Sequence, residues 1–224
     1  GAGEPAGADA GTGTGAGAGF QAATMAGMCD DLIALSHSFV AYMDLVRGAT
    51  TPRRRQVRTL GALLAALEAR FGPEAAARGL SWSCELASDD VRVTTDLDGW
   101  DQAVGHLVRN ALAFTPAGGS VRVVGRADAE AASWCVRVTD SGPGIPEAMR
   151  PRVFEPFVGL TPSDRPMMPG AGLGLASCQL LAEGLGGQVT IEPGPEGGTI
   201  ACLRLPLAGS ADRAGGTRRR TQSR

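Results

Sequence analysis

Hydrophobic residues separated by three or four positions form a stripe in the first quarter of the chain. Its members are Met25, Met28, Leu32, Leu35, Phe39, Tyr42 and Val46. The spacing predicts a helix with the a and d positions of a coiled coil or helical hairpin, and Gly48 fits its C-cap. A single amphipathic helix packed on its own domain would give a similar stripe. Because few apolar residues flank the stripe, the pattern favours pairing with another helix.

After Thr51-Pro52, which breaks this helix, the hydrophobic pattern changes repeatedly between helical and strand periods. Helices are predicted from about Val57 to Ala77, Trp100 to Phe114 and Leu173 to Leu185, with a turn and helix start over Asp96 to Gly99. Strands are predicted over 81–86, 91–95, 121–124, 134–139, 188–192 and 199–205, the middle two and the last two as antiparallel pairs. The order predicts an α/β fold, a two-layer sandwich of a mixed β-sheet with helices on one face.

Both ends of the chain have a composition that does not favour a packed core. Residues 1–19 are almost entirely Gly, Ala, Thr and acidic residues, which predicts a flexible linker. Residues 209–224 place Arg218, Arg219, Arg220 and Arg224 on a segment rich in Gly, Thr and Ser. We expect this tail to be solvated and disordered rather than a patch that contacts phosphates.

The overall composition, 43% hydrophobic and 20% charged residues, is that of a soluble globular protein. A net charge of −2 gives no global positive field, so we expect no nucleic-acid partner. No apolar run approaches the ~18 residues of a membrane span, and there is no signal peptide. The first residue is not Met, so we expect a cytoplasmic piece of a longer protein, without membrane contact in this part.

The residues that often bind metals or form disulfides are scattered. The five cysteines, Cys29, Cys84, Cys135, Cys178 and Cys202, contain no C-x-x-C pair. This pattern predicts reduced, buried thiols in a cytosolic compartment, not a disulfide or zinc framework. The two histidines have no ligand candidates at metal spacing. Every other basic residue is arginine, so no lysine can contact a phosphate.

Four short motifs follow one another in the second half of the chain. They are His106-Leu-Val-Arg-Asn-Ala111, Asp140-Ser-Gly-Pro-Gly-Ile145, Val153-Phe-Glu-Pro-Phe157 and Gly170-Ala-Gly-Leu-Gly-Leu175. Each alone is weak, because glycine-rich loops are common. In this order and spacing they resemble the ATP-binding catalytic domain of bacterial sensor histidine kinases, in the wider family of gyrase, the mismatch-repair ATPases and the heat-shock chaperone. The resemblance extends from about Pro52 to Pro206 and implies that residues 52–208 bind ATP.

His106 and Asn110 are four residues apart, so both side chains leave one face of a helix, away from its apolar face. An amide oxygen there suits one side of a hydrated Mg²⁺ shared with phosphates. The resemblance implies that Asn110 is the magnesium ligand and that His106 is the first polar residue of the same catalytic motif. Hydrolysing relatives have a glutamate there as general base, and its absence favours transfer to a protein. Two polar residues on a helix surface would be the plainer interpretation.

The sequence departs from the family pattern three residues after Asn110. The family usually has Lys or Arg there, and this chain has Ala113. A charge that would contact the ATP phosphates is therefore missing, which would lower affinity or rate. Arg165, in the predicted lid, is a candidate replacement.

Asp140 ends a predicted strand and precedes Gly142 and Gly144. An ionised carboxylate only accepts hydrogen bonds, which suits the amino group of adenine, and glycines let backbone approach a ligand closely. The resemblance implies that Asp140 contacts adenine and that Gly142, Gly144 and Ile145 line the nucleotide site. A turn-forming Asp before Gly is the alternative for this motif alone.

The last two motifs resemble a hinge, a lid and a phosphate loop. Phe154 and Phe157 would be the hinge, with residues 158–169 as the lid, although two such phenylalanines could equally belong to the core. The predicted phosphate loop comprises Gly170, Gly172, Leu173, Gly174 and Leu175. It leads into a helix whose backbone N–H groups can face anions, and the absence of a preceding strand disfavours a Rossmann dinucleotide site. Thr199 matches the last family motif, or simply opens a strand.

His37 is the other histidine of interest, since kinases of this type phosphorylate one. It lies two positions after Leu35, at an outward-facing position of the predicted helix. It is followed by Ser38-Phe39-Val40 rather than by the acidic residue usual in the family. We therefore interpret His37 as a solvated surface residue and expect the acceptor histidine upstream of Gly1.

The resemblance thus predicts the C-terminal part of a two-component sensor histidine kinase, using ATP and Mg²⁺. Residues 20–48 would be the second helix of a dimerisation hairpin, which would form a homodimer. The phosphoryl group would pass from ATP to a histidine and then to a response-regulator receiver domain. The alternatives are a serine kinase of the anti-sigma-factor type, disfavoured by the stripe at 25–46, and a non-catalytic nucleotide-binding module, which Ala113 keeps open.

Overall fold

The computed structural model describes residues 32–48, 54–158 and 172–207. A five-stranded sheet has the order β2-β4-β5-β7-β6, and a two-stranded sheet pairs β1 with β3. The strands are β1 (Arg55–Thr59), β2 (Ser81–Leu86), β3 (Arg92–Asp96), β4 (Ser120–Asp128), β5 (Ser133–Asp140), β6 (Gln188–Pro193) and β7 (Thr199–Pro206). The larger sheet is mixed, because β2 runs parallel to β4 whereas the other pairs are antiparallel.

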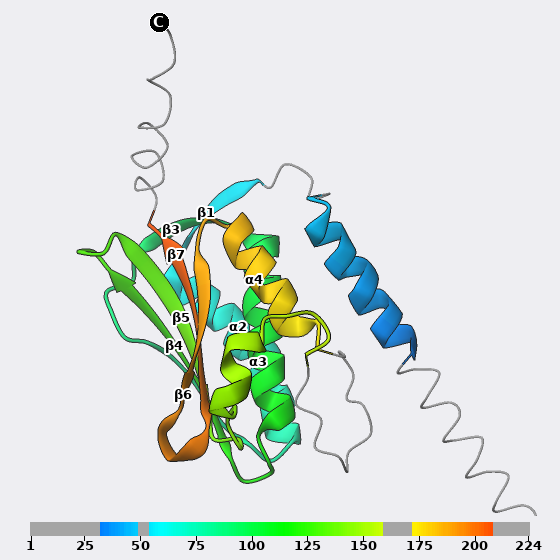
Figure 1. Cartoon of the computed structure of the whole chain (residues 1–224). Coiled ribbons are helices and arrows are strands. Elements are labelled where there is room, and N and C mark those ends of the chain that lie inside the picture. The colour runs from blue at the N-terminus through cyan, green and yellow to red at the C-terminus, as the bar shows by residue number, and fades with distance from the viewer. Residues whose placement is uncertain (1–31, 49–53, 159–171, 208–224) are drawn as a thin grey trace, which may run out of the picture.

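Three α-helices, α2 (Leu60–Ala77), α3 (Leu97–Phe114) and α4 (Gly174–Gly184), cover one face of the larger sheet (Figure 1). Short 3-10 turns over Glu147–Arg152 and Pro195–Gly197 complete the described elements. The core lies between the two layers and includes Trp100 of α3 and Trp134 of β5, whose ring centroids are 6.3 Å apart. The predicted two-layer sandwich is therefore confirmed.

The helix predicted from Val57 begins three residues later. Residues 55–59 instead form β1, paired with β3. Thr59 has an extended backbone, and its hydroxyl accepts a hydrogen bond from the Ala62 amide at 3.2 Å, which caps α2. Val57 is 46% exposed and does not belong to the apolar face of α2. Asp96 caps α3 in the same way through the Gly99 amide.

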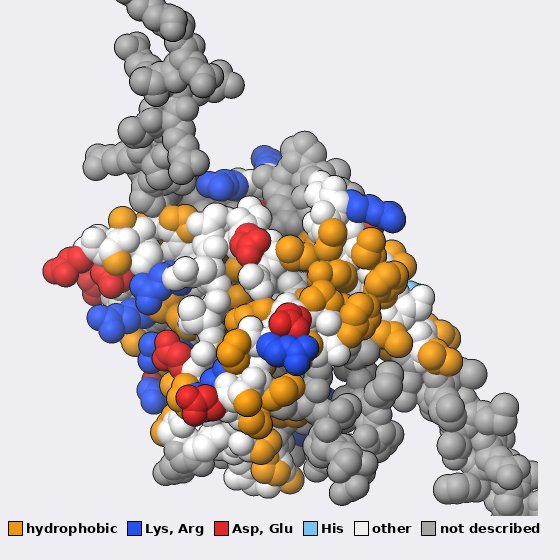
Figure 2. Space-filling model, in the orientation of Figure 1, with side chains coloured by type: hydrophobic (Ala, Val, Ile, Leu, Met, Phe, Trp, Pro, Cys, Tyr) orange, Lys and Arg blue, Asp and Glu red, His pale blue; other side chains and the backbone are white. Residues whose placement is uncertain are grey.

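A further helix covers residues 32–46 and lies on the helical side of the domain, beyond α4 (Figure 1). Hydrophobic side chains gather over it in Figure 2, and its exposed members are Leu32, Ile33, Phe39, Val40 and Val46. Leu45, which is outside the predicted stripe, packs against the core. Phe39 of the stripe lies against Phe157, with ring centroids 6.2 Å apart. The stripe residues Met25 and Met28, the linker 1–19 and the tail 209–224 lie outside the described residues. Within the described ranges, no helix combines the length and hydrophobicity that crossing a bilayer requires.

Candidate functional site

Asp140 is the last residue of β5, and its carboxylate is held by backbone amides from two segments. Oδ1 accepts hydrogen bonds from the Gly142 amide at 2.9 Å and from the Thr199 amide at 3.2 Å. Burial raises the pKa of Asp140, while these N–H groups and the Thr199 hydroxyl oppose the rise because they stabilise the charged form. The geometry therefore fixes Oδ1 between the two segments.

Glycines allow these two segments to approach each other. A Cβ on Gly198 would lie 1.8 Å from the Asp140 carbonyl oxygen, and one on Gly144 would lie 2.0 Å from the Gly197 oxygen. Gly144 also has φ +71°, which disfavours other residues. The sequence singled out Gly142, Gly144 and Thr199 but not Gly197 and Gly198. The Gly-Gly pair just before Thr199 was the available indication.

The Asp140 loop also contacts the C-terminal end of α3. A Cβ on Gly142 would be 3.0 Å from the Phe114 carbonyl oxygen, so the loop lies directly against this helix end. Ile145 is half-buried, and its carbonyl accepts a hydrogen bond from Arg150 Nε at 3.0 Å. The α3 motif and the Asp140 motif, predicted separately, therefore belong to one region.

His106 and Asn110, one turn apart on α3, both face the start of α4. A Cβ on Gly174 would lie 3.6 Å from Asn110 Oδ1 and 3.6 Å from His106 Nδ1. Burial, and secondly the charge of Arg109, lower the pKa of His106 to about 4. The imidazole is therefore neutral at physiological pH. Ala113, in the next turn, is half-buried and brings no charge to this region.

The start of α4 presents backbone N–H donors beside these side chains. Among the described residues no side chain caps its N-terminus, and Leu173 and Leu175 pack into the protein. The first N–H groups of a helix lack intrahelical partners and attract anions. This end of α4 can therefore accept a phosphate group next to Asn110 and His106.

The segment that ends at Val158 contacts Gly172, in the predicted phosphate loop. Phe157 donates its amide hydrogen to the Gly172 carbonyl at 3.2 Å, and a Cβ on Gly172 would clash with the Phe157 carbonyl carbon at 2.8 Å. Phe157 has φ +64° and is 60% exposed as a residue, whereas Phe154 is half-buried. Phe157 is therefore not a core residue. Arg165 and Gly170, predicted to contact the nucleotide, lie outside the described residues.

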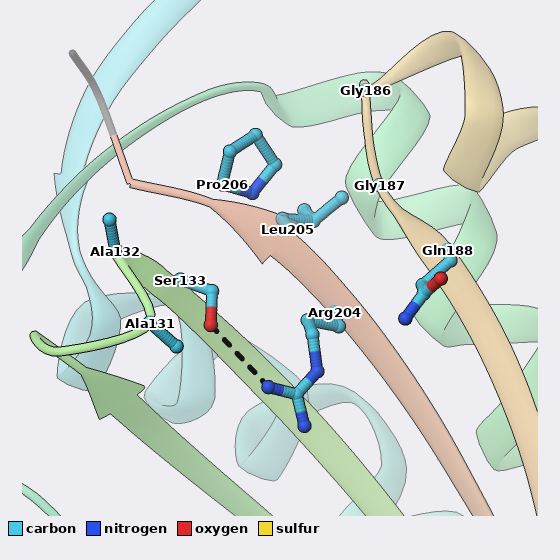
Figure 3. Close-up of a pocket in the computed structure, with 9 residues that line it drawn as sticks. All are labelled: Ala131, Ala132, Ser133, Gly186, Gly187, Gln188, Arg204, Leu205 and Pro206. Carbon is cyan, nitrogen blue, oxygen red and sulfur yellow. Dashed lines mark hydrogen bonds between the residues drawn. The ribbon is translucent and has the colours of Figure 1, made fainter. Parts of the chain in front are cut away.

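A separate shallow pocket of about 290 Å³ lies at the other end of β5 (Figure 3). Its lining residues come from the start of β5, the end of β7 and the turn after α4, and include Ser133, Gly187, Gln188 and Arg204. Asp140 is at the opposite end of the eight-residue strand from Ser133, so this pocket is distinct from the region around Asp140.

Comparison with known proteins decides the family. Residues 95–209 match the family described as histidine kinase-, DNA gyrase B- and HSP90-like ATPase. The chain belongs to this family. Within it, the chain is an ATP-binding catalytic domain of the histidine-kinase type, as the four motifs had predicted.

The signal transduction histidine-protein kinase AfsQ2 of Streptomyces coelicolor is 43% identical over 127 residues, which are 55% of this chain and 23% of AfsQ2. The adaptive-response sensory kinase SasA of a Synechococcus species is 31% identical over 169 residues, 74% of this chain and 44% of SasA. The chain thus spans less than half the length of these relatives. Among solved structures, the mycobacterial sensor histidine kinase MprB matches with a TM-score of 0.57 at 25% identity. The match covers 69% of this chain and 98% of the MprB chain. The ThkA catalytic domain matches with a TM-score of 0.59 at 24% identity and shows the same fold. This match covers 69% of this chain and 96% of the ThkA chain.

Proposed function

We propose that this catalytic domain transfers the γ-phosphoryl group of ATP to a histidine of a sensor histidine kinase. The observation that supports this most directly is the approach of Gly174 to Asn110 and His106. It puts a helix N-terminus suited to phosphate beside an amide and an imidazole. Asp140, held by Gly142 and Thr199, would bind the adenine amino group near the C-terminal end of α3. Protein groups would then surround both ends of one nucleotide.

The residues present fit a Mg²⁺ ion bound together with ATP. Asn110 offers an amide oxygen, and the neutral imidazole of His106 does not repel a cation. The described residues contain no cluster of three or more His, Cys, Asp or Glu side chains. A site completed by phosphates and water does not need one. Asn110 would hold the ion, and the ion would neutralise phosphate charge during transfer.

The chain itself would contribute positioning rather than covalent chemistry. Asp140 would orient the base, and the first amides of α4 would orient the phosphates. His106 would present a neutral nitrogen at the reacting end, without the carboxylate that activates water in hydrolysing relatives. This arrangement favours transfer to an acceptor side chain over hydrolysis, because His106 stands where hydrolysing relatives have the glutamate general base.

The predicted partners follow from the same proposal. One solved structure with the same fold is that of the histidine kinase ThkA in complex with the response regulator protein TrrA. We propose that this chain acts likewise with a response-regulator receiver domain and a homodimeric helix hairpin. The exposed hydrophobic residues of helix 32–46 support an interface there, because such side chains lose contact with water when two helices pair.

The proposal can be tested with radiolabelled ATP and a separate dimeric hairpin domain that contains a kinase acceptor histidine. Transfer should give label on the hairpin that is lost in acid, and a receiver domain should then take up that label. Acid-stable label on a serine substrate, with none on the hairpin, would instead support the serine-kinase alternative. ATP binding by calorimetry without any transfer would support a non-catalytic module, the alternative that the absence of charge at Ala113 keeps open.

A further inference from the structure

The larger sheet has a second face, away from the helices, where cysteine and arginine side chains alternate. Cys135 on β5 is directly opposite Arg204 on β7 and Arg126 on β4. On the same strands, Arg137 is directly opposite Cys202. Side chains two residues apart on a strand share a face, so these five side chains belong to one surface. We name Cys135, Cys202, Arg126, Arg137 and Arg204 the cysteine–arginine cluster.

The cluster leaves one cysteine accessible and the other covered. Cys135 is half-buried, whereas Cys202 is 6% exposed, and both are free thiols. Cys135 and Cys202 are diagonal neighbours on the paired strands β5 and β7. Arg204 extends toward β5, where its Nη1 contacts Ser133 Oγ at 3.5 Å (Figure 3). Its guanidinium is thereby directed to the strand that contains Cys135.

These contacts favour the thiolate at Cys135. The hydrogen bond from Cys202 and then the charges of Arg204, Arg137 and Arg126 lower the pKa of Cys135 to about 6, although burial opposes this. The same hydrogen bond, with burial, raises the pKa of Cys202, so Cys202 keeps its proton and donates it. The acidic groups on this face are fewer than the arginines. Glu85 on β2 pairs with Arg122 at 2.8 Å. Asp128 on β4 and Glu192 on β6, opposite Ser133 and Ile200, are outnumbered by the three arginines of the cluster.

Two other uses of the thiol pair fit poorly. Three guanidinium groups would repel a metal cation from two sulfur ligands. An internal disulfide is also disfavoured by the register, because Cys135 and Cys202 are diagonal rather than directly opposed. Diagonal positions lie about 7–8 Å apart, beyond the roughly 4.4–6.8 Å that Cα atoms of a disulfide require.

We infer that the cysteine–arginine cluster is a thiol-modification site in which Cys135 reacts with anionic low-molecular-weight disulfides. The Cys135 thiolate attacks one sulfur of the disulfide, the sulfur–sulfur bond breaks, and the second sulfur leaves as a thiolate. The product is a mixed disulfide on Cys135, and no further oxidant is needed. The arginines attract the anionic reagent, and Cys202 stabilises the attacking thiolate. A reducing thiol reverses the reaction. This site is independent of the proposed phosphotransfer.

The test measures reaction of the full chain with dithiobis(nitrobenzoate), an anionic disulfide, and with neutral dithiodipyridine. A Cys29→Ser background removes the cysteine outside the described residues. We expect one fast thiol whose rate depends on pH with a midpoint near the pKa of about 6 given above. Cys135→Ser should abolish the fast phase. Cys84→Ser is the matched control, because Cys84 is half-buried on β2 and burial raises its pKa to about 11.

Charge variants show whether the arginines, rather than the exposure of Cys135 alone, make its thiol react fast. Arg137→Gln and Arg204→Gln should each slow the anionic reagent about threefold to tenfold near pH 6.5, and the neutral reagent less. Arg122→Gln should change neither rate, since Arg122 already pairs with Glu85. Cys202→Ala should slow the reaction of Cys135. Cys202→Ser should retain most of the native rate, because its hydroxyl can still donate a hydrogen bond. A fast phase that survives in Cys135→Ser, or equal rates in all arginine variants, would overturn the proposal.

Discussion

The backbone amide of Thr199 donates a hydrogen bond to Oδ1 of Asp140, 59 residues earlier in the chain, at 3.2 Å. This contact joins the start of β7 to the end of β5, and the close approach of Gly198 to the Asp140 carbonyl makes it possible. The carboxylate is therefore positioned before any ligand arrives. A preorganised acceptor loses little freedom on binding, which increases the affinity that one hydrogen bond can contribute.

Replacing Asp140 with Asn should weaken ATP binding by about tenfold to a hundredfold, or roughly 1.5–3 kcal/mol. An Asn oxygen can still accept from Gly142 and Thr199, but the amide nitrogen then faces the adenine amino group. Calorimetry on both proteins measures the difference. Asp128→Asn is the matched control, since Asp128 also accepts a backbone amide, from Ala131, outside the site. Unchanged ATP affinity in Asp140→Asn would refute the adenine assignment.

Asn110→Ala should weaken Mg-ATP binding more than adenosine binding. The substitution removes an oxygen that faces Gly174 and leaves the contacts of Asp140 intact. The advantage of Mg-ATP over adenosine should therefore shrink, while adenosine affinity is retained. Titrations of both ligands with and without Mg²⁺ give the comparison. An equal loss for the two ligands would indicate a local folding defect in α3 instead.

His106 should make the protein less stable as pH falls from 6.5 towards 4. Its folded-state pKa of about 4 lies below the ordinary value of 6.5, so the unfolded chain binds the proton first in that window. Stability is fully present above pH 6.5, and below pH 4 both states are protonated and the effect no longer grows. We expect His106 to account for about 1–2 kcal/mol of the loss at pH 5.

Urea unfolding of the native chain and of His106→Asn at pH 7 and pH 5 measures this contribution. The variant should lose less stability between the two values, because Asn does not titrate. The raised pKa of Asp140 acts in the opposite direction in both proteins and cancels in the difference. Identical pH profiles would show that His106 is not buried as the structure has it.

The tryptophan pair in the core gives a test of packing. Neither Trp134 Nε1 nor Trp100 Nε1 has a hydrogen-bond partner among the described residues, so Trp134 contributes mainly through its apolar volume. Trp134→Ala should cost about 3–5 kcal/mol, and Trp134→Phe clearly less, because the lost donor has no partner to leave unsatisfied. Denaturant unfolding of the two variants measures both costs. Equal costs would mean that Nε1 has a partner.

The sequence was sufficient for contacts that depend on local pattern. The i, i+4 spacing of His106 and Asn110 put both on one helix face, and the structure turns both towards Gly174. Asp96 was predicted at a helix start and caps α3. These outcomes need only helical geometry, which a few neighbouring residues determine.

Features that depend on long-range register were not predictable in this way. Residues 55–59 form a strand because β3 pairs with them, and no local pattern shows that pairing. Gly198 was not recognised because its partner, the Asp140 carbonyl, is on another strand. The five cysteines were interpreted as unconnected buried thiols. Only the register of β5 and β7 brings Cys135 and Cys202 together and leaves Cys135 half-buried.

His37 should not become phosphorylated when the 224-residue chain is incubated with Mg-ATP. The side chain is exposed on helix 32–46, as predicted, but its neighbours Ser38 and Phe39 do not provide an acidic residue. The Ser38 hydroxyl donates a hydrogen bond to the Ala34 carbonyl at 2.8 Å. Phosphoryl transfer needs the acceptor nitrogen in line with the γ-phosphate at near-contact distance, which chance encounters rarely achieve. Radiolabelled ATP with the native chain and with His37→Gln tests this, using a dimeric hairpin with an acceptor histidine as the positive control. Acid-labile label on the native chain that is absent from His37→Gln would identify His37 as the acceptor and contradict the prediction.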